Sequence, residues 1–160
     1  MKHLRIIIPA LLFCICTSAQ LVVHVYDGDT YRIFHKGKFQ IVRLANVDAP
    51  ELSQYYGKIV KNEVSSLLLT KPVSLTYYGK DRYGRQLAKV TVGQISVDSF
   101  LLSKGWAWYW KKYSHDIKLG IVADMAKRAK QGMWRCDHNI PPWVWRQLIA
   151  RQKRLKEMCR

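Results

Sequence analysis

Short runs of β-favouring residues, separated by tight turns, dominate the first part of this chain. Leu21 to Tyr26 is followed by Asp27-Gly28, a dipeptide suited to a hairpin, and Thr30 to Phe34 predicts the returning strand. A second turn at Lys36-Gly37 leads into the alternating segment Lys38 to Leu44. These three segments predict an antiparallel meander, so the fold must be built around a sheet.

The hydrophobic period then changes to that of a helix. Gly57 to Leu69 places its apolar residues on one helical stripe, whereas Pro72 to Tyr78 and Leu87 to Val92 again favour strands. The later helices are expected at Val97 to Lys104, at about Ile121 to Lys130 with Asp116 or Ser114 near its start, and at about Trp143 to Lys156. Five short strands with a helix between the third and fourth predict an α+β fold, a five-stranded OB-type β-barrel with about three to four helices.

The charge of the chain narrows its possible partners. It carries 27 Lys+Arg against 11 Asp+Glu over 160 residues, a formal net charge of +16. This length favours one domain, and 49% hydrophobic residues can form its core. Such a charge favours polyanions, namely nucleic acid, an anionic membrane surface or an acidic polysaccharide. A role of the charge in solubility alone is the simpler alternative.

The first 19 residues have the pattern of a secretory signal peptide. Lys2 and Arg5 precede the apolar run Ile6 to Cys16, and Thr17-Ser18-Ala19 supplies small residues for cleavage. The run is too short for a transmembrane helix. We expect cleavage near Ala19 and secretion of residues 20–160 to the periplasm or the medium as a monomer, with no transmembrane segment and no stable protein partner; an uncleaved anchor is the alternative.

Two cysteines, Cys136 and Cys159, remain after that cleavage. In an oxidising compartment they are candidates for a disulfide, but their spacing leaves open whether they pair. A metal site using Cys136 and His138 is disfavoured, because no nearby residues complete a tetrahedral set.

Three motifs, taken together, bring carboxylates and arginines into this chain. Carboxylate oxygens bind hard divalent cations, and guanidinium groups hold phosphate oxygens in a bidentate fork, so together they point to phosphodiester chemistry. The motifs are Asp27-Gly28-Asp29-Thr30, Arg43-Leu44 followed by Val47-Asp48-Ala49-Pro50-Glu51, and Asp81-Arg82-Tyr83-Gly84-Arg85. In order and spacing they resemble the signature of staphylococcal-type thermonucleases, and the resemblance extends from about Val22 to Trp145.

This resemblance implies a calcium-dependent nuclease of DNA and RNA that is folded as an OB-type barrel and leaves 3′-phosphates. The implied metal ligands are Asp29, Asp48 and the backbone carbonyl of Ala49. The implied catalytic positions are Arg43, Glu51 and Arg85. Calcium takes about 6 to 8 oxygen ligands, so such a site would stay open to water and a substrate phosphate.

Some roles remain open at this stage. Glu51 either accepts a proton from the attacking water or only orients that water. Asp27 is better explained as a turn residue than as a ligand. Arg82 and Tyr83 are candidate substrate contacts, with a solvated charge and a packed ring as the respective alternatives. The aromatic residues from Trp106 to Tyr113 are expected mainly to pack rather than to stack on bases.

Ala49 stands where the best-known family member has Thr, which removes a hydroxyl but keeps the backbone carbonyl. A catalytically silent OB-type nucleic-acid-binding protein is the main alternative, although it would not need the whole set of acidic and basic positions. A cationic membrane-active or anion-binding protein would explain the charge but not the acidic positions.

Overall fold

A computed structural model describes residues 20–136 and 139–158, with side chains described up to Gln152. The expected signal peptide and Cys159 lie outside these residues, so cleavage near Ala19 and the pairing of Cys136 with Cys159 stay predictions. Cys136 itself is exposed.

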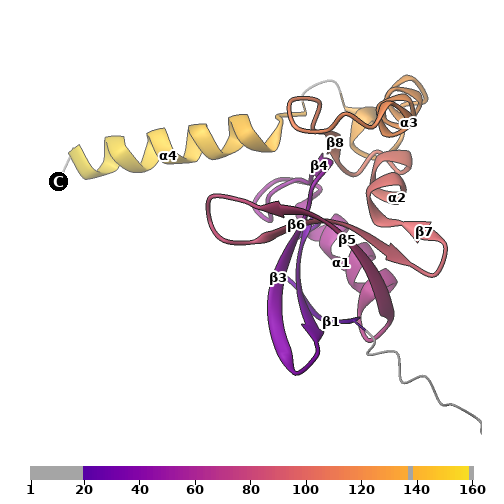
Figure 1. The fold of residues 1–160 in the computed structure, drawn as a ribbon. Helices are drawn as coiled ribbons and strands as arrows, with labels where there is room; N and C mark the ends of the chain where they lie inside the picture. Colours follow the sequence, from indigo (N-terminus) through magenta and orange to yellow (C-terminus); the bar gives the residue numbers. More distant parts are fainter. Residues whose placement is uncertain (1–19, 137–138, 159–160) are drawn as a thin grey trace, which may run out of the picture.

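Five strands form a closed barrel, as predicted (Figure 1). The strands are β1 (Gln20–Val25), β2 (Thr30–His35), β3 (Lys38–Leu44), β5 (Pro72–Lys80) and β6 (Gln86–Val92). The first three form the antiparallel meander, and β1 and β6 pair with the two edges of β5. A parallel pairing of β3 with β6 closes the ring and sets Arg43 opposite Leu87.

The barrel interior is apolar, and helix α1 (Gly57–Leu68) packs against it. On β3 the inward residues are Val42 and Leu44, both fully buried, whereas Phe39 and Ile41 are exposed on the outer face. The stripe predicted for α1 is confirmed, because Val60, Val64 and Leu68 are its fully buried apolar side chains.

The remaining elements lie to one side of the barrel (Figure 1). They are β4 (Val47–Asp48), β7 (Ile95–Ser96), α2 (Val97–Ser103), β8 (Trp108–Tyr109), α3 (Ile117–Arg128), the 3-10 helix η1 (Gly132–Arg135) and α4 (Pro142–Met158). Helix α3 begins four residues earlier than the hydrophobic pattern indicated, because the Asp116 side chain accepts hydrogen bonds from the N–H groups of Lys118 and Leu119. The two-residue strands and η1 were not predicted.

Helix α4 leaves the body of the molecule and projects beyond the barrel (Figure 1). Its first turns lie against other elements, where Trp145 and Arg146 meet the loop that follows β4. Across the described part of the chain, every helix is too short or too polar to cross a membrane.

Candidate active site

The β1–β2 turn lies against the segment after β4, and Gly28 permits this close approach. A Cβ atom at Gly28 would lie 2.6 Å from the Cβ of Ala49 and 2.7 Å from Cγ1 of Val60. The Ala49 N–H donates to Oδ2 of Asp29 at 2.7 Å. Two motifs that are 20 residues apart are thereby joined, with the Asp29 carboxylate beside the backbone of Ala49.

Asp27 shapes this turn. Its Oδ1 accepts a hydrogen bond from the Asp29 N–H at 3.0 Å, the pattern of an Asx turn. Burial, together with the neighbouring Asp29 carboxylate, raises the pKa of Asp27 to about 7. This contact matches the turn role that the sequence favoured for Asp27.

Arg43 lies between two buried carboxylates, although it shares a strand face with the exposed Phe39 and Ile41. Its side chain is 5% exposed, with Nη1 2.9 Å from Oδ2 of Asp29 and Nη2 2.7 Å from Oδ1 of Asp48. Nη1 also donates to the carbonyls of Leu44 and Val47. Burial alone would lower the pKa of Arg43, but Asp29 and Asp48 outweigh it and raise that pKa.

Asp48 is the most deeply buried member of this cluster, with no exposed surface. Its backbone is held in the β4–β8 pairing, opposite Trp108. Burial raises the pKa of the Asp48 carboxyl and Asp29 adds to the rise, against the effect of a hydrogen bond from Arg146. A buried carboxylate of this kind is stabilised in its charged form by neighbouring positive charge.

Glu51 borders the cluster on its open side. Its backbone N–H donates to Oε1 of Gln54 at 2.9 Å, which holds the loop after Pro50. The Glu51 side chain is 34% exposed, against 1% for Asp48. A carboxylate at the border of a buried charged site is accessible to water.

Arg146 of α4 completes the cluster, and the sequence interpretation missed this contact. Its Nη2 is 2.8 Å from Oδ2 of Asp48, and its Nη1 is 2.5 Å from Oε1 of Glu51. Burial alone would lower the pKa of Arg146, but hydrogen bonds to both carboxylates raise it. Arg146 is 95 residues from Glu51, so no local pattern links them. The only available signal was its place beside Trp145 in the first turns of a helix.

The third motif forms a turn of its own. Asp81 accepts the N–H groups of Tyr83 and Arg85, and its Oδ2 is 2.7 Å from Nε of Arg85. Arg82 donates to the hydroxyl of Tyr83, whose side chain is highly exposed. Arg82 and Tyr83 are therefore free to meet a ligand, and their predicted substrate contacts stay predictions.

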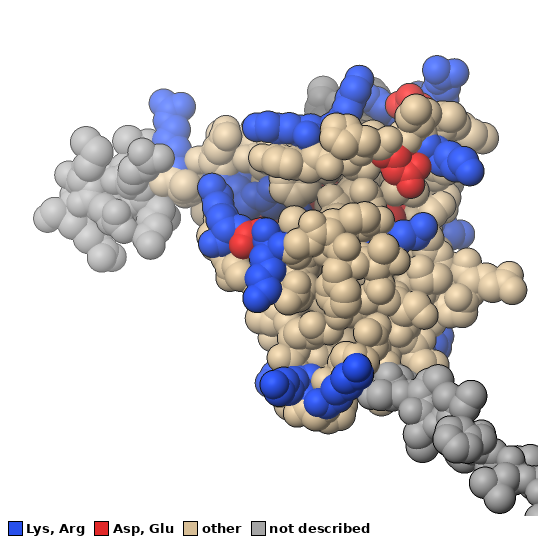
Figure 2. All heavy atoms as spheres, viewed as in Figure 1, with Lys and Arg blue, Asp and Glu red and all other residues tan. Residues whose placement is uncertain are grey.

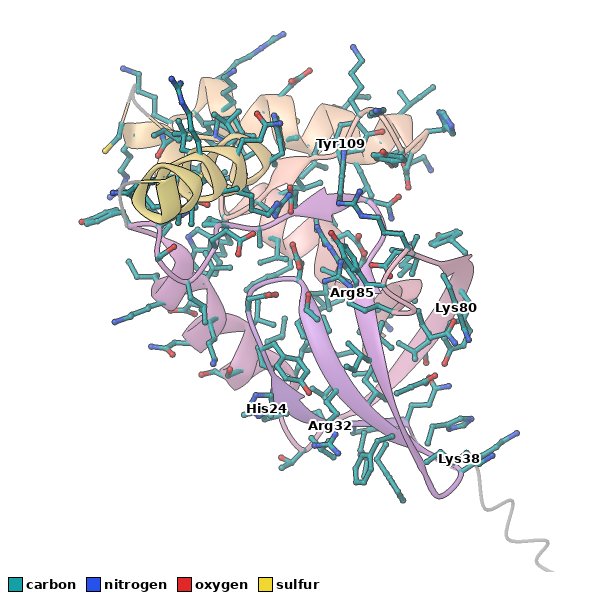
Figure 3. All side chains as sticks on the ribbon, turned by 90° about the vertical axis from the view of Figure 1, so that its left-hand side faces the viewer. His24, Arg32, Lys38, Lys80, Arg85 and Tyr109 are labelled. Atoms are coloured by element: carbon teal, nitrogen blue, oxygen red, sulfur yellow. The ribbon has the colours of Figure 1, made fainter. Side chains whose placement is uncertain are left out.

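Arg85 lies just before β6 and is not bonded to the acidic cluster. Within the described ranges, its only ion pair is the one with Asp81, and none joins it to Asp29, Asp48 or Glu51. The parallel pairing places it two residues before Leu87, the partner of Arg43. Figure 3 shows Arg85 well away from Lys38, which marks the far β2–β3 hairpin. The phosphate contact predicted for Arg85 would lie away from the β2–β3 hairpin.

The donor set of the site suits a hard cation. Asp29 and Asp48 offer carboxylate oxygens, and one guanidinium bridges them, so the two side chains lie close together. Among the described residues no group of three or more His, Cys, Asp and Glu side chains is arranged to hold a metal. Two carboxylates and a backbone carbonyl nevertheless fit a calcium ion that takes its other ligands from water and substrate. The ligand role of the Ala49 carbonyl stays a prediction.

The aromatic segment after α2 mostly packs. Trp106 and Tyr109 contact the hydrophobic core, and the ring of Trp110 lies 5.1 Å from the Arg43 guanidinium carbon. Tyr113 is the clear exception, at 62% exposed.

Comparison with known proteins finds a matching family model and several related sequences. A family model described as "Staphylococcal nuclease homologue" matches residues 41–136. An uncharacterized endonuclease of Escherichia coli O157:H7 is 38% identical over 126 residues, which cover 78% of this chain and 82% of the relative. One from Haemophilus influenzae is 40% identical, covering 78% and 71%. A micrococcal nuclease of Shigella flexneri is 30% identical over 136 residues, covering 78% of each.

Proposed function

Because this chain belongs to the staphylococcal nuclease family, we propose that it is a calcium-dependent, secreted nuclease that hydrolyses phosphodiester bonds of DNA and RNA and leaves 3′-phosphate ends. One observation carries the proposal: Asp29, Asp48 and Glu51, from two separate motifs, are linked into one cluster by the ion pairs of Arg43 and Arg146. A simple binding barrel does not need buried carboxylates at that position, since they repel a polyanion.

The surface charge supports a nucleic-acid substrate. The chain has a formal net charge of +16, and Lys and Arg side chains are spread over the face shown in Figure 2, with few acidic ones. Such a surface attracts phosphate backbones without regard to sequence and weakens with salt. The exposed Tyr83 and Arg82 offer a ring and a charge at the barrel end, where we propose that they contact substrate.

Asp29 and Asp48, with the Ala49 carbonyl, would hold the calcium ion. A bound calcium ion supplies charge stabilisation at a phosphoryl oxygen. Arg43 holds the two carboxylates together, and its guanidinium adds positive charge at the floor of the site. Arg85, partly exposed and anchored through its Nε to Asp81, keeps both terminal nitrogens available for a phosphate.

The exposure of Glu51 supports a role of this side chain on the attacking water. It is the most exposed of the three clustered carboxylates, and its loop is held by the hydrogen bond to Gln54. We assign it the acceptance of a proton from the attacking water. In the competing role, Glu51 orients the water without taking its proton. The two roles predict different pH dependences of the cleavage rate.

Secretion is proposed from the first 19 residues alone, whose basic start, apolar run and small residues match a signal peptide. Comparison of the N-terminus of protein isolated from the medium or periplasm with that of cellular protein tests this part. A secreted form that retains Met1 would contradict cleavage near Ala19.

The central experiment offers the purified protein plasmid DNA, single-stranded DNA and RNA, with calcium or with excess chelator. We expect cleavage only with calcium, and end-group analysis should show 3′-phosphates. Binding of all three substrates without cleavage under any divalent cation would instead support the silent binding barrel. Products with 5′-phosphates would contradict the proposal that cleavage leaves 3′-phosphates, but they would still support nuclease activity.

A further inference from the structure

The guanidinium of Arg146 occupies the open face of the carboxylate cluster. It spans Asp48, at 2.8 Å, and Glu51, at 2.5 Å, and its side chain remains 43% exposed. By contrast, both terminal nitrogens of Arg43 already donate to carboxylates or backbone carbonyls in the buried floor of the site. Arg146 is thus the arginine that lies at the border between the acidic cluster and solvent.

We propose that Arg146 is a further phosphate-binding residue of this active site, contributed by α4 and held on Asp48 and Glu51 until cation and substrate arrive. The inference rests on the proposed function. A guanidinium fork that matches a carboxylate also matches two oxygens of a phosphate, so the same side chain can serve both partners.

The charges of the site favour this exchange. Arg146 and a calcium ion would share the Asp48 carboxylate, and a divalent cation competes strongly with a monovalent group there. A cation on Asp48 would weaken the attraction that holds Arg146 there and leave the pair with Glu51 as its remaining ion pair. The released guanidinium then lies next to a site that has gained positive charge and attracts phosphate oxygens.

Helix α4 keeps Arg146 at the site when those ion pairs open. The neighbouring Trp145 donates its indole N–H to Oγ of Ser53 at 2.9 Å. Just before the helix, the carbonyl of Ile140 accepts a hydrogen bond from Gln54 at 2.7 Å. Both contacts attach the start of α4 to the loop that carries Glu51, so Arg146 can turn toward substrate without moving its helix.

The test compares wild type with Arg146→Gln, Arg146→Lys and the control Arg151→Ala, which removes one charge from an exposed position on the same helix. Calorimetry measures the affinity for calcium and, with calcium present, for a nucleoside 5′-phosphate, which contains no phosphodiester bond to cut. Rates of DNA cleavage are measured alongside.

The two affinities should move in opposite directions in Arg146→Gln. Calcium binding should tighten by roughly 2- to 5-fold, because a competing cation is gone. Phosphate binding should weaken by roughly 10- to 100-fold, with a similar loss of kcat/KM. Arg146→Lys keeps the charge without the fork, so it should retain wild-type calcium affinity and recover only part of the phosphate affinity. Arg151→Ala should leave both affinities unchanged.

Three results would overturn the inference. Faster cleavage with tighter phosphate binding in Arg146→Gln would make Arg146 an obstacle to substrate. Weakening of both affinities would make it a support for the Glu51 loop alone. Unchanged phosphate affinity would remove its role altogether. If wild type neither binds calcium nor cleaves DNA, the proposed function itself fails, and this inference with it.

Discussion

Replacement of Arg43 by methionine isolates the role of the buried charge at the floor of the site. Methionine keeps an unbranched, roughly comparable side chain but removes the guanidinium that lies 2.9 Å from Asp29 and 2.7 Å from Asp48. Both carboxylates are almost fully buried, at 7% and 1% side-chain exposure. They would lose their shared partner without gaining access to water.

Removal of one partner from a buried ion pair costs about 3 to 5 kcal/mol when the other charge is left uncompensated. Asp48 keeps its ion pair with Arg146, so the uncompensated charge is chiefly that of Asp29. We expect Arg43→Met to lose that much free energy of unfolding at neutral pH without calcium. The pKa of Asp48, already raised by burial, would rise further. Protonation of this carboxyl removes the cost of its buried charge. The difference in the free energy of unfolding between Arg43→Met and wild type should therefore shrink as the pH falls toward about 4. Calcium at about 100 times its Kd should add about 3 kcal/mol to the free energy of unfolding of either protein.

Urea unfolding of wild type and Arg43→Met at several pH values, with calcium or with chelator, measures these changes in the free energy of unfolding. The matched control is Arg85→Met, which breaks the more exposed pair with Asp81 and should cost less than about 1 kcal/mol. A loss in Arg43→Met no larger than in the control, or one independent of pH, would refute the assignment of Arg43 as the compensating charge.

Three further substitutions test separate parts of the account. Gly28→Ala places a Cβ 2.6 Å from that of Ala49, so it should lower the unfolding temperature and weaken calcium binding together; an unchanged calcium affinity would contradict the close approach. Glu51→Gln should slow turnover by roughly 100- to 10,000-fold if Glu51 takes the proton, and an unchanged rate would eliminate that role. Asp98 is fully buried, its Oδ2 lacks a partner within the described part of the chain, and burial raises its pKa to about 6. Asp98 should therefore contribute a fall in wild-type stability of up to about 3 kcal/mol as the pH rises from about 4 to 6, beside the contribution of Asp27, whose pKa is also raised. Asp98→Asn should remove the Asp98 contribution; the same pH dependence in both proteins would exclude Asp98 as a source.

The barrel could be predicted because its determinants are local. Asp27-Gly28 and Lys36-Gly37 mark the hairpin turns, and alternation along Lys38–Leu44 marks a strand with an inner and an outer face. The start of α3 was placed too late, because Lys118 and Gly120 weaken its hydrophobic stripe while the Asp116 cap determines where it begins. The β4–β8 pairing is only two residues long, so neither strand has a detectable period.

Some residues of the site could likewise be predicted from local sequence, and others could not. Asp29, Asp48 and Glu51 could be selected from short motifs, and the structure places them around one position. The position of Arg43 on the strand face of Phe39 and Ile41 indicated that its charge needs a partner. It did not show that two buried carboxylates would be those partners. Arg146 escaped prediction because its contacts depend on how α4 leaves η1 and returns to the Glu51 loop, which is a tertiary property.

The most direct test of the central claim is a calcium titration of the initial rate of plasmid cleavage, with wild type beside Asp48→Asn. Asp48 accepts ion pairs from both arginines at the site and is the proposed carboxylate ligand with the least contact with solvent. The wild-type rate should be zero in excess chelator and should rise to saturation with calcium. The variant should need at least about 10 times more calcium, as expected for the loss of one charged ligand. Wild-type cleavage in excess chelator, or the same midpoint for both proteins, would contradict the account.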